Sequence, residues 1–292
     1  MTLLYTDPVF LKHETGQHPE TPDRLRAVTA RLNKTELVKQ CTPGTYKPLA
    51  EEAVAKLHDA KMVLRAEQVC EHGGGMLDAD TVVSPDSFRV ALAAAGACAA
   101  AVDAVLKGPD RNALCLVRPP GHHATPTRSM GFCLFGNVAL AAQHARDRHG
   151  LSRLLIVDWD VHHGNGFYPG TGAADEMGRG KGLGYTLNEP IRFGTPRKEY
   201  RDRFARALEK AAGMIRPELV LVSAGFDAHA KDPIGSLGLD VEDFAVLTKQ
   251  VLGVAKTHAQ GRVVSCLEGG YNLNALAESV QAHLEELLAA KP

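Results

Sequence analysis

The sequence predicts an α/β protein whose central, mainly parallel sheet is flanked by helices on both faces. Short apolar runs alternate along the chain with longer stretches of helical spacing, as expected of strand–helix units. The runs show little alternation between apolar and polar residues, which is typical of strands buried on both faces. Each run leads directly into a segment rich in Gly, His, Asp or Tyr, and parallel sheets bind ligands at the carboxyl ends of their strands. We therefore expect these segments to converge on one site.

The predicted elements follow one another in a regular order. Four apolar runs are predicted strands, each with its polar segment immediately after it: 113–117 and 118–123, 154–157 and 158–166, 219–222 and 223–229, and Val263–Leu267 and 268–271. Ser84 can cap a helix with Pro85 at its first position, and this alanine-rich helix continues to Lys107. Further helices are predicted over 199–215 and, after the capping residue Asp240, over 241–259. No internal repeat or linker interrupts this order, so residues 1–292 are expected to form one domain.

Composition limits the classes of function. The formal net charge is −1 and no long basic run occurs, which gives no support for binding to nucleic acid. The six cysteines are scattered, and several lie within apolar runs, so buried reduced thiols are expected. The first residues lack the pattern of a secretory signal, and we expect no apolar stretch of membrane-spanning length. A cytoplasmic protein without a membrane partner is the expected default.

The segments after two of the strands hold paired histidines beside carboxylates. Asp160 and His162 are two residues apart at a predicted strand end, so their side chains can project from the same side and reach one ion. Asp227 is the best candidate for a third ligand from another strand end, although it could instead cap a loop. Two carboxylates and one imidazole suit a catalytic zinc or ferrous ion with room for water and substrate. Either histidine pair alone would more often be structural.

Taken together, these motifs resemble those of the histone deacetylase superfamily, close to the bacterial and class II-like branch that includes acetylpolyamine amidohydrolases. The matching motifs occur in the same order across nearly the whole chain: 18–25, 84–85, 118–123, 131–135, 158–166, 167–172, 223–235 and 268–271. The resemblance implies an arginase/deacetylase-like three-layer fold. It also implies a metal-dependent amidohydrolase that acts on linear amides.

The resemblance assigns a role to each residue of the expected site. Asp160, His162 and Asp227 become the metal ligands, in agreement with the spacing. His122 and His123 become the tandem catalytic histidines. The resemblance also pairs Asp158 with His122 and Asn165 with His123. Tyr271 would stabilise the oxyanion, and His163 would have a supporting role.

These pairings predict different properties for the two tandem histidines. A carboxylate next to an imidazole favours its charged form, whereas a neutral amide has much less effect. His123 is therefore expected to act as general base and later as acid, with His122 as its electrostatic partner. Tyr271 would donate a hydrogen bond to the developing oxyanion.

Substrate recognition is also inferred from the resemblance. Phe132 matches one aromatic wall of the acyl-lysine tunnel, Tyr168 is the candidate for the opposite wall, and Gly131 can offer a backbone contact. Polyamine-selective relatives carry an acidic gatekeeper where this chain has Ile234. This difference favours acyl-lysine or another uncharged acyl amide as the substrate. Arg24 and Arg118 are expected to organise the core behind the site.

The chain departs from the family pattern after Gly166. A family segment of roughly 20 residues, enough for a helical turn and one strand, is absent between Gly166 and Phe167. That segment normally supplies a central strand and ligands for monovalent-cation sites, so potassium is a less secure expectation than zinc. A natural deletion, an engineered removal and a sequence that omits a stretch of the natural chain all remain open.

The main hypothesis is a zinc-dependent deacetylase that removes acetyl or other acyl groups from an N-acyl amine, with acetyl-lysine preferred. The partners would be an acylated amine, peptide or protein substrate, hydroxamate-type inhibitors and, as a further option, other copies of the chain. The alternatives are an acetylpolyamine amidohydrolase and, because of the absent segment, a non-catalytic metal-binding scaffold. An arginase-like two-metal hydrolase would need additional Asp and His ligands, which we do not find.

Overall fold

A computed structural model describes residues 1–162 and 168–290, and its centre is a parallel sheet of six strands. The strand order is β2-β1-β5-β8-β7-β6, and every neighbouring pair is parallel. The strands are β1 (Thr2–Tyr5), β2 (Cys41–Pro43), β5 (Asn112–Cys115), β6 (Leu154–Asp158), β7 (Leu219–Ala224) and β8 (Val263–Leu267). The four predicted strands are confirmed and are consecutive neighbours. The short strands β1 and β2 were not predicted.

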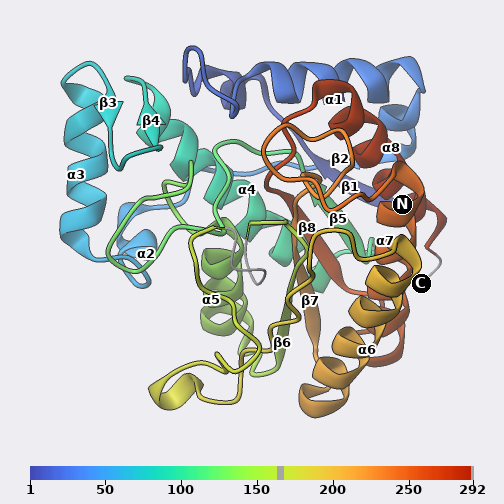
Figure 1. The fold of residues 1–292 in the computed structure, drawn as a ribbon. Helices are drawn as coiled ribbons and strands as arrows, with labels where there is room; N and C mark the ends of the chain where they lie inside the picture. The colour runs from blue at the N-terminus through green and yellow to red at the C-terminus, as the bar shows by residue number, and fades with distance from the viewer. Residues whose placement is uncertain (163–167, 291–292) are drawn as a thin grey trace.

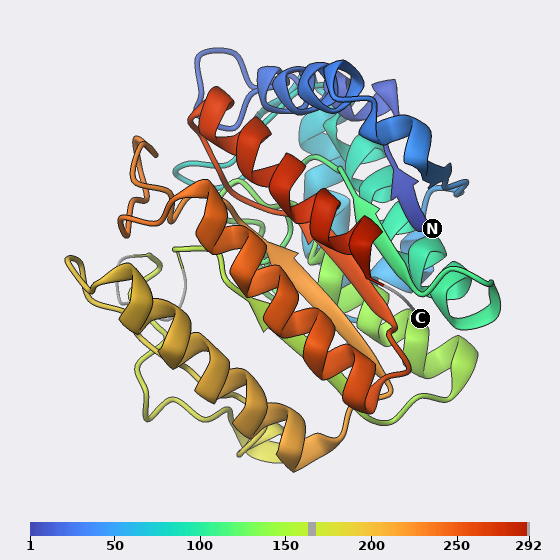
Figure 2. The same cartoon turned by 90° about the vertical axis from the view of Figure 1, so that its right-hand side faces the viewer.

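Helices cover both faces of this sheet (Figures 1 and 2). One layer contains α1 (Asp23–Lys34), α8 (Leu273–Ala289), α7 (Val241–His258) and α6 (Arg197–Ile215), each packed against the next. The opposite layer contains α4 (Ser87–Lys107) and α5 (Asn137–His149). This arrangement confirms the predicted α/β class with helices on both faces. The short elements α2 (Glu51–Val54), α3 (Ala60–Glu71), β3 (Gly75–Met76) and β4 (Val82–Val83) lie beside the α4 layer (Figure 1). Three further segments form 3₁₀ turns: η1 (Pro8–Lys12), η2 (Leu37–Gln40) and η3 (Gly180–Gly182).

The first residues of α7 and α4 can be compared with the capping residues predicted from the sequence. Helix α7 begins after Asp240, whose side chain accepts from the Val241 N–H within a capping box completed by Asp243, as the sequence predicted in part. The prediction for α4 was wrong by two residues, because the N-cap is Asp86 rather than Ser84 and the helix begins at Ser87 rather than Pro85. The Ser87 hydroxyl instead accepts a hydrogen bond from the backbone of Ser84, which holds 84–86 in a turn before the helix.

Helix α4 corrects the expectation that no apolar stretch is long enough to span a membrane. Ser87–Lys107 passes that test by length and composition, and 67% of its apolar window is buried inside the protein. The helix packs against α5, β5 and β8. Its apolar character therefore reflects a position in the core, where alanines allow close helix packing.

Strand β6 lies at one edge of the sheet. It pairs with β7 on one side, and none of the described residues pairs with its other side. Burial alternates along the strand, and Ile156 is 47% exposed. The described strands therefore form a sheet without an internal gap, and β6 has a free edge among the described residues.

Candidate active site and metal centre

The segments that follow β5, β6, β7 and β8 meet at the carboxyl edge of the sheet. His122 follows β5, Asp160 follows β6, Asp227 follows β7 and Tyr271 follows β8. Side-chain contacts connect the four segments: His122 with Asp160, His162 with Asp227, and His162 with Tyr271. The prediction that the polar segments converge is confirmed, because parallel strands end at the same edge.

Asp160, His162 and Asp227 form a compact cluster of two carboxylates and one imidazole. The Nδ1 atom of His162 lies 3.1 Å from Asp160 Oδ1 and 2.9 Å from Asp227 Oδ2. One ligand atom from each residue lies within 4.8 Å of the others. Both carboxylates are buried, and the imidazole is nearly so. Oxygen and imidazole donors at this spacing fit a zinc or ferrous ion.

Backbone amides and two glycines allow the carboxylates to lie this close together. The Gly269 N–H donates to Asp160 Oδ2 at 2.9 Å, and the Val161 N–H donates to Asp227 Oδ1 at 2.9 Å. A Cβ atom at Gly269 would collide with carboxylate oxygens of both Asp160 and Asp227. A Cβ atom at Gly225 would collide with Asp160. The two glycines are therefore part of the cradle that holds the carboxylates.

Two groups of the cluster, Asp227 and His162, bind a proton more tightly than usual because the charged groups share a small buried volume. Burial and the charge of Asp160 raise the pKa of Asp227 to about 7. Burial also disfavours ionised Asp160, but the charges of His122 and His162 outweigh this and hold its pKa well below the usual value. Burial lowers the pKa of His162, whereas hydrogen bonds to Asp160 and Asp227 raise it, with a net value of about 10. A divalent cation would displace the protons that this site holds.

His122 lies beside the cluster and pairs with a carboxylate. Its Nδ1 atom lies 2.9 Å from Asp158 Oδ2, and its Nε2 atom lies 3.7 Å from Asp160 Oδ2. Burial lowers the pKa of His122, but the charges of Asp160 and Asp158 outweigh burial and hold the pKa well above its usual value. The structure therefore contains the predicted His122–Asp158 pair, and His122 is held in its charged form.

His123 is adjacent to His122 but faces different neighbours. The two imidazole centroids are 3.9 Å apart. The ring of His123 also lies 4.9 Å from the ring of Tyr168 and 6.3 Å from that of His162, between centroids. Asn165, the predicted partner of His123, lies outside the described residues, as does His163.

Tyr271 is held next to the cluster from two sides. Its ring centroid lies 6.2 Å from that of His162, and Arg24 Cζ lies 5.0 Å from the same tyrosine ring. The Tyr271 N–H donates to Asp232 Oδ2 at 2.7 Å, and Arg24 Nε donates to the Gly270 carbonyl at 2.7 Å. Burial raises the pKa of Tyr271 well above its usual value despite the charge of Arg24. The phenol is therefore neutral and can donate a hydrogen bond.

Each predicted aromatic wall contacts one of the candidate catalytic side chains. Phe132 packs edge-on against Tyr271, with centroids 5.8 Å apart, and against His18 at 4.5 Å. Tyr168 packs edge-on against His123. His18, for which no role was predicted, supports the Phe132 ring from the N-terminal segment.

A glycine is required at position 131 because the backbone there lies close to the His123 ring. Its φ of 59° lies in the left-handed region, and a Cβ atom there would collide with the His123 ring. The Gly131 N–H donates to Asp80 Oδ1 at 3.1 Å, and its carbonyl oxygen accepts a weak hydrogen bond from Cys133 Sγ at 3.2 Å. A hydrogen bond from the substrate to the Gly131 carbonyl oxygen would therefore have to share this oxygen with the Cys133 thiol.

Ile234 borders the cluster through its backbone. Its carbonyl oxygen lies 3.3 Å from His162 Nε2, and its N–H donates to Asp232 Oδ1 at 3.0 Å. The other carboxylate oxygen of Asp232 accepts from the Tyr271 backbone. Asp232 thus ties the segment that contains Ile234 to the segment that contains Tyr271.

Arg24 and Arg118 organise the buried core behind the site, as predicted. Arg118 donates from Nε and Nη2 to the two carboxylate oxygens of Glu20 at 2.5 and 2.7 Å. Arg24 Nη1 donates to Glu20 Oε1 at 3.0 Å. All three side chains have no exposed surface, and the two guanidinium charges hold this carboxylate in place.

Three carboxylates for which no role was predicted position the site. Glu268 Oε2 accepts from the backbone N–H groups of Gly121 and His122 at 2.6 and 3.2 Å. Asp232 and Asp80 make the contacts described above. Glu268 and Asp232 lie within recognised motifs, and that position was the only signal for them. Asp80 lies 51 residues before Gly131, outside any motif, so no local pattern could have identified it.

The fold and this site define a class of protein. It is an α/β protein with a candidate donor set for a metal ion at the carboxyl edge of a parallel sheet, beside two histidines and a tyrosine. The chain belongs to the histone deacetylase family, because the family model described as "Histone deacetylase domain" matches residues 18–167 and 166–287. This confirms the resemblance found in the sequence.

Individual relatives agree with this assignment. The chain is 36% identical to a "Histone deacetylase-like amidohydrolase" from Pseudomonas aeruginosa, over 87% of this chain and 73% of the relative. It is 41% identical to "Polyamine deacetylase HDAC10" from Homo sapiens, over 92% of this chain and 44% of that protein. The solved structure of the HDA15 HD domain superimposes with a TM-score of 0.92 at 33% identity, covering 100% of this chain and 90% of that one. The family and these names support deacetylase or amidohydrolase activity in general.

The comparisons also locate the absent segment. The two ranges matched by the family model meet at residues 166–167. The alignment with the Pseudomonas protein runs over 276 positions but covers 87% of this chain. Since 87% of 292 residues is about 254, about 22 aligned positions (276 less 254) have no residue in this chain. This number agrees with the departure noted in the sequence.

Proposed function

We propose that the chain is a zinc-dependent deacetylase that hydrolyses an N-acyl amine, with acetyl-lysine as the preferred substrate. The observation that carries the proposal is the meeting of three features at one sheet edge. These are the Asp160, His162 and Asp227 cluster, the His122–Asp158 pair, and the neutral phenol of Tyr271. The family supports amide hydrolysis in general, and the donor set supports zinc in particular.

Asp160, His162 and Asp227 would hold the ion, which when bound supplies Lewis acidity towards the acyl carbonyl and lowers the pKa of a water molecule. His123 takes a proton from the attacking water as general base and returns it to the leaving amine. Charged His122, paired with Asp158, stabilises negative charge that develops nearby. Tyr271 donates its phenolic hydrogen to the oxyanion, and its backbone contact with Asp232 and its ring contact with Arg24 fix it for this task.

The substrate assignment rests on the surroundings of the cluster. Phe132 and Tyr168 would line a passage for the methylene stem of acyl-lysine, and the Gly131 carbonyl would accept a hydrogen bond from the substrate backbone. Ile234 carries no charge with which to attract a second ammonium group. An acetylpolyamine is the second candidate substrate, because the human relative is named a polyamine deacetylase. We place all of this chemistry in one catalytic domain over residues 1–292 in the cytoplasm.

Acetate release from the metal-loaded protein tests this function. Acetyl-lysine peptides and acetylated di- and polyamines are offered at equal concentration, with a hydroxamate that chelates zinc as the inhibitor control. We expect turnover that the hydroxamate abolishes and that is higher on the peptides. Higher turnover on polyamines would transfer the assignment to the second candidate. No release from any acyl amide by a preparation that contains one ion per site would overturn the proposal.

The absent segment supports one different candidate, a metal-binding scaffold without catalysis. The matched ranges of the family model break next to a site segment, and the ligands of the family's potassium sites would fall in the absent stretch. The scaffold predicts bound zinc and hydroxamate binding with no released acetate. Measuring metal content, hydroxamate affinity and acetate release on one preparation separates the two candidates.

A further inference from the structure

A second cluster of ligating side chains lies away from the active site. Asp103 is on α4, and His144 and His149 are on α5, which packs against α4. Helix α4 leads into β5 and α5 leads into β6, so the C-terminal ends of both helices lie at the amino edge of the sheet. The active site lies at the opposite, carboxyl edge. Neither the family motifs nor the proposed reaction uses these three residues.

The three side chains converge on one point. His144 Nε2 lies 3.0 Å and His149 Nε2 lies 2.5 Å from the same oxygen atom, Asp103 Oδ1. The two imidazole centroids are 6.0 Å apart, with the rings inclined at 66°. One ligand atom from each residue lies within 4.8 Å of the others. Two imidazoles and a carboxylate are a common donor set for zinc.

We propose that Asp103, His144 and His149 form a second binding site for a divalent transition-metal ion of the zinc type, which links α4 to α5. Zinc ligands in a tetrahedral site lie about 3.3 Å from one another. The nitrogen–oxygen distances found here fall short of that value by less than about 1 Å, which small side-chain rotations can supply. Neutral imidazole can carry its hydrogen on Nδ1, and this leaves the Nε2 lone pair free for the ion.

The site is open enough for an ion to enter and for water to complete its coordination. The side chain of Asp103 is 41% exposed, that of His144 is 20% exposed and that of His149 is 10% exposed. Three protein ligands leave one position of a tetrahedral ion to solvent. Each residue can therefore reach the ion without opening of the core.

The local charge is compatible with a cation. Burial raises the pKa of Asp103, but the hydrogen bonds from His144 and His149 outweigh it, so the pKa lies below its usual value and the carboxylate is ionised. His149 is the last residue of α5, where the helix dipole favours positive charge. Arg146 and Arg148 lie on the same last turn and reduce this benefit, so the charge of Asp103 is essential to binding.

An ion at this position would stabilise the fold. It would join two helices of the same layer through side chains 41 and 46 residues apart. An ion that binds only the folded chain raises the free energy of unfolding by RT ln(1 + [L]/Kd), where [L] is the concentration of the free ion. This stabilisation does not depend on turnover at the active site. The expected effect is a higher unfolding temperature with unchanged turnover.

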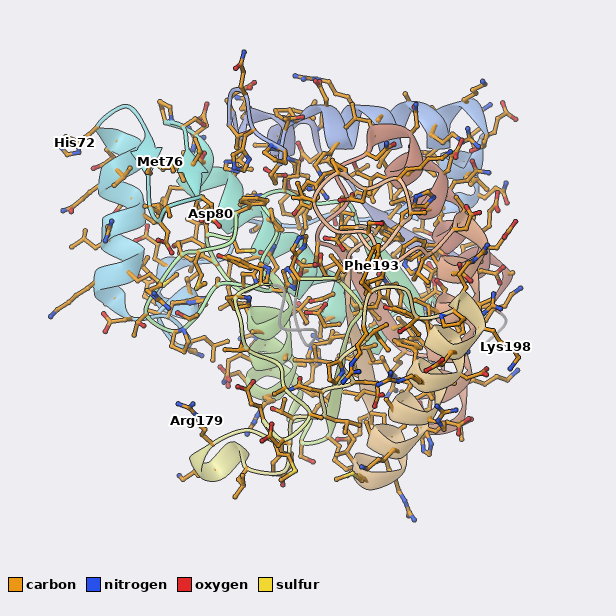
Figure 3. The ribbon with its side chains drawn as sticks, in the orientation of Figure 1. His72, Met76, Asp80, Arg179, Phe193 and Lys198 are labelled. Carbon is orange, nitrogen blue, oxygen red and sulfur yellow. The ribbon has the colours of Figure 1, made fainter. Side chains whose placement is uncertain are left out.

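Zinc titration of the holoprotein tests the proposal. Protein whose active site already holds its ion is titrated with Zn²⁺ by calorimetry, and the bound metal is counted after desalting. The test variants are Asp103→Asn, which keeps the size of the side chain, and His149→Gln. His72→Gln is the matched control, because His72 lies at the outer end of α3, far from α5 (Figure 3).

The expected result is one further ion per chain in the wild type and in His72→Gln, with none in either test variant. Zinc should raise the unfolding temperature of the first two proteins only, while all four keep the same turnover at equal loading of the active site. Equal zinc binding in all four proteins, or no further ion in the wild type, would overturn the proposal. If His149→Gln fails to fold, Asp103→Asn alone decides.

Discussion

Two carboxylates that are close in the sequence serve different neighbours in the site. Asp158 pairs with His122, whereas Asp160 belongs to the cluster with His162 and Asp227. The separation arises because Asp158 ends β6, while Asp160 lies in the turn after it and accepts the Gly269 N–H. A shift of one residue here would place neither carboxylate at its partner, because side chains one residue apart in an extended segment point to opposite sides.

Replacing Tyr271 by Phe should lower kcat by about 10²–10³, since it removes one hydrogen bond to the oxyanion. Zinc content should not change, because the phenol is not one of the proposed ligands. Steady-state kinetics and metal analysis on the same preparation measure both quantities. Tyr185→Phe, at an exposed tyrosine, is the control and should retain full activity. An undiminished rate in Tyr271→Phe would remove this residue from the mechanism.

Replacing Gly269 by Ala should weaken metal binding at the active site by at least about tenfold, or 1.4 kcal/mol. The new methyl group would force Asp160 and Asp227 apart, since its ideal position overlaps their carboxylate oxygens. Competition with a chelator of known affinity measures the change. Gly213→Ala is the matched control, because nothing lies within 4 Å of a Cβ atom at this position on α6. Equal affinities in both variants would contradict the proposed cradle.

At the scale of elements, a buried histidine joins α8 to its neighbours. Within α8, His283 places Nδ1 2.7 Å from the Thr248 hydroxyl of α7 and Nε2 2.9 Å from the Ser265 hydroxyl of β8. Its ring packs edge-on against Trp159 at 5.6 Å. Burial lowers the pKa of His283 to about 3. No sequence pattern indicated this role, because a lone histidine on a helix is equally compatible with an exposed position.

His283 should make stability depend on pH. Its pKa in the folded chain lies below the ordinary value of about 6.5, so the unfolded chain binds the proton more readily. The stabilisation is therefore present above about pH 6.5 and is lost as the pH falls towards 3. Between pH 7 and pH 5 this amounts to about 2 kcal/mol. Urea unfolding at both pH values measures it.

The His283→Gln variant isolates this contribution. The variant lacks the titrating group, so its free energy of unfolding should fall by about 2 kcal/mol less than that of the wild type over the same pH interval. His72→Gln should behave as the wild type does. Identical pH dependence in His283→Gln and the wild type would show that other groups cause the loss.

At the scale of the whole molecule, the site joins four strands, so metal binding should stabilise the fold. In the Asp103→Asn background, which lacks the second proposed ion, zinc at about 100 times Kd should add about 2.7 kcal/mol to the free energy of unfolding. Chelation should remove this increment. Thermal or urea unfolding with and without chelator tests it, and an unchanged midpoint would show that the folded chain does not prefer the ion.

Two exposed features of the whole molecule bear on the segment that is absent after Gly166. Strand β6 has an edge with no partner among the described residues, and Ile156 on it is partly exposed. Further large apolar side chains are exposed between Met177 and Phe193, and Phe193 itself, which is labelled in Figure 3, is 86% exposed. Loss of a strand beside β6 would leave the unpaired edge of β6. The expectation that the absent segment would have supplied a central strand stays a prediction, and the unpaired edge of β6 is a place in the described sheet where such a strand could pair.

The sequence alone determined the class of fold, the four strands around the site and several of the residues that meet there, among them Asp160, His162 and Asp227. The run Val263–Leu267 coincides with β8 at both ends. This success has a physical reason, since strands buried on both faces need apolar residues and a metal cluster needs particular side chains at strand ends.

Only the tertiary structure decided which distant residues support the site and form other clusters. Asp80 reaches Gly131, and Asp103 meets His144 and His149, across intervals of 41 to 51 residues. The short strand β1 is placed between β2 and β5 by pairing with both. These contacts join segments that are far apart in the chain, so they leave no periodicity or local motif, and they exist only once the helices and the sheet have packed together.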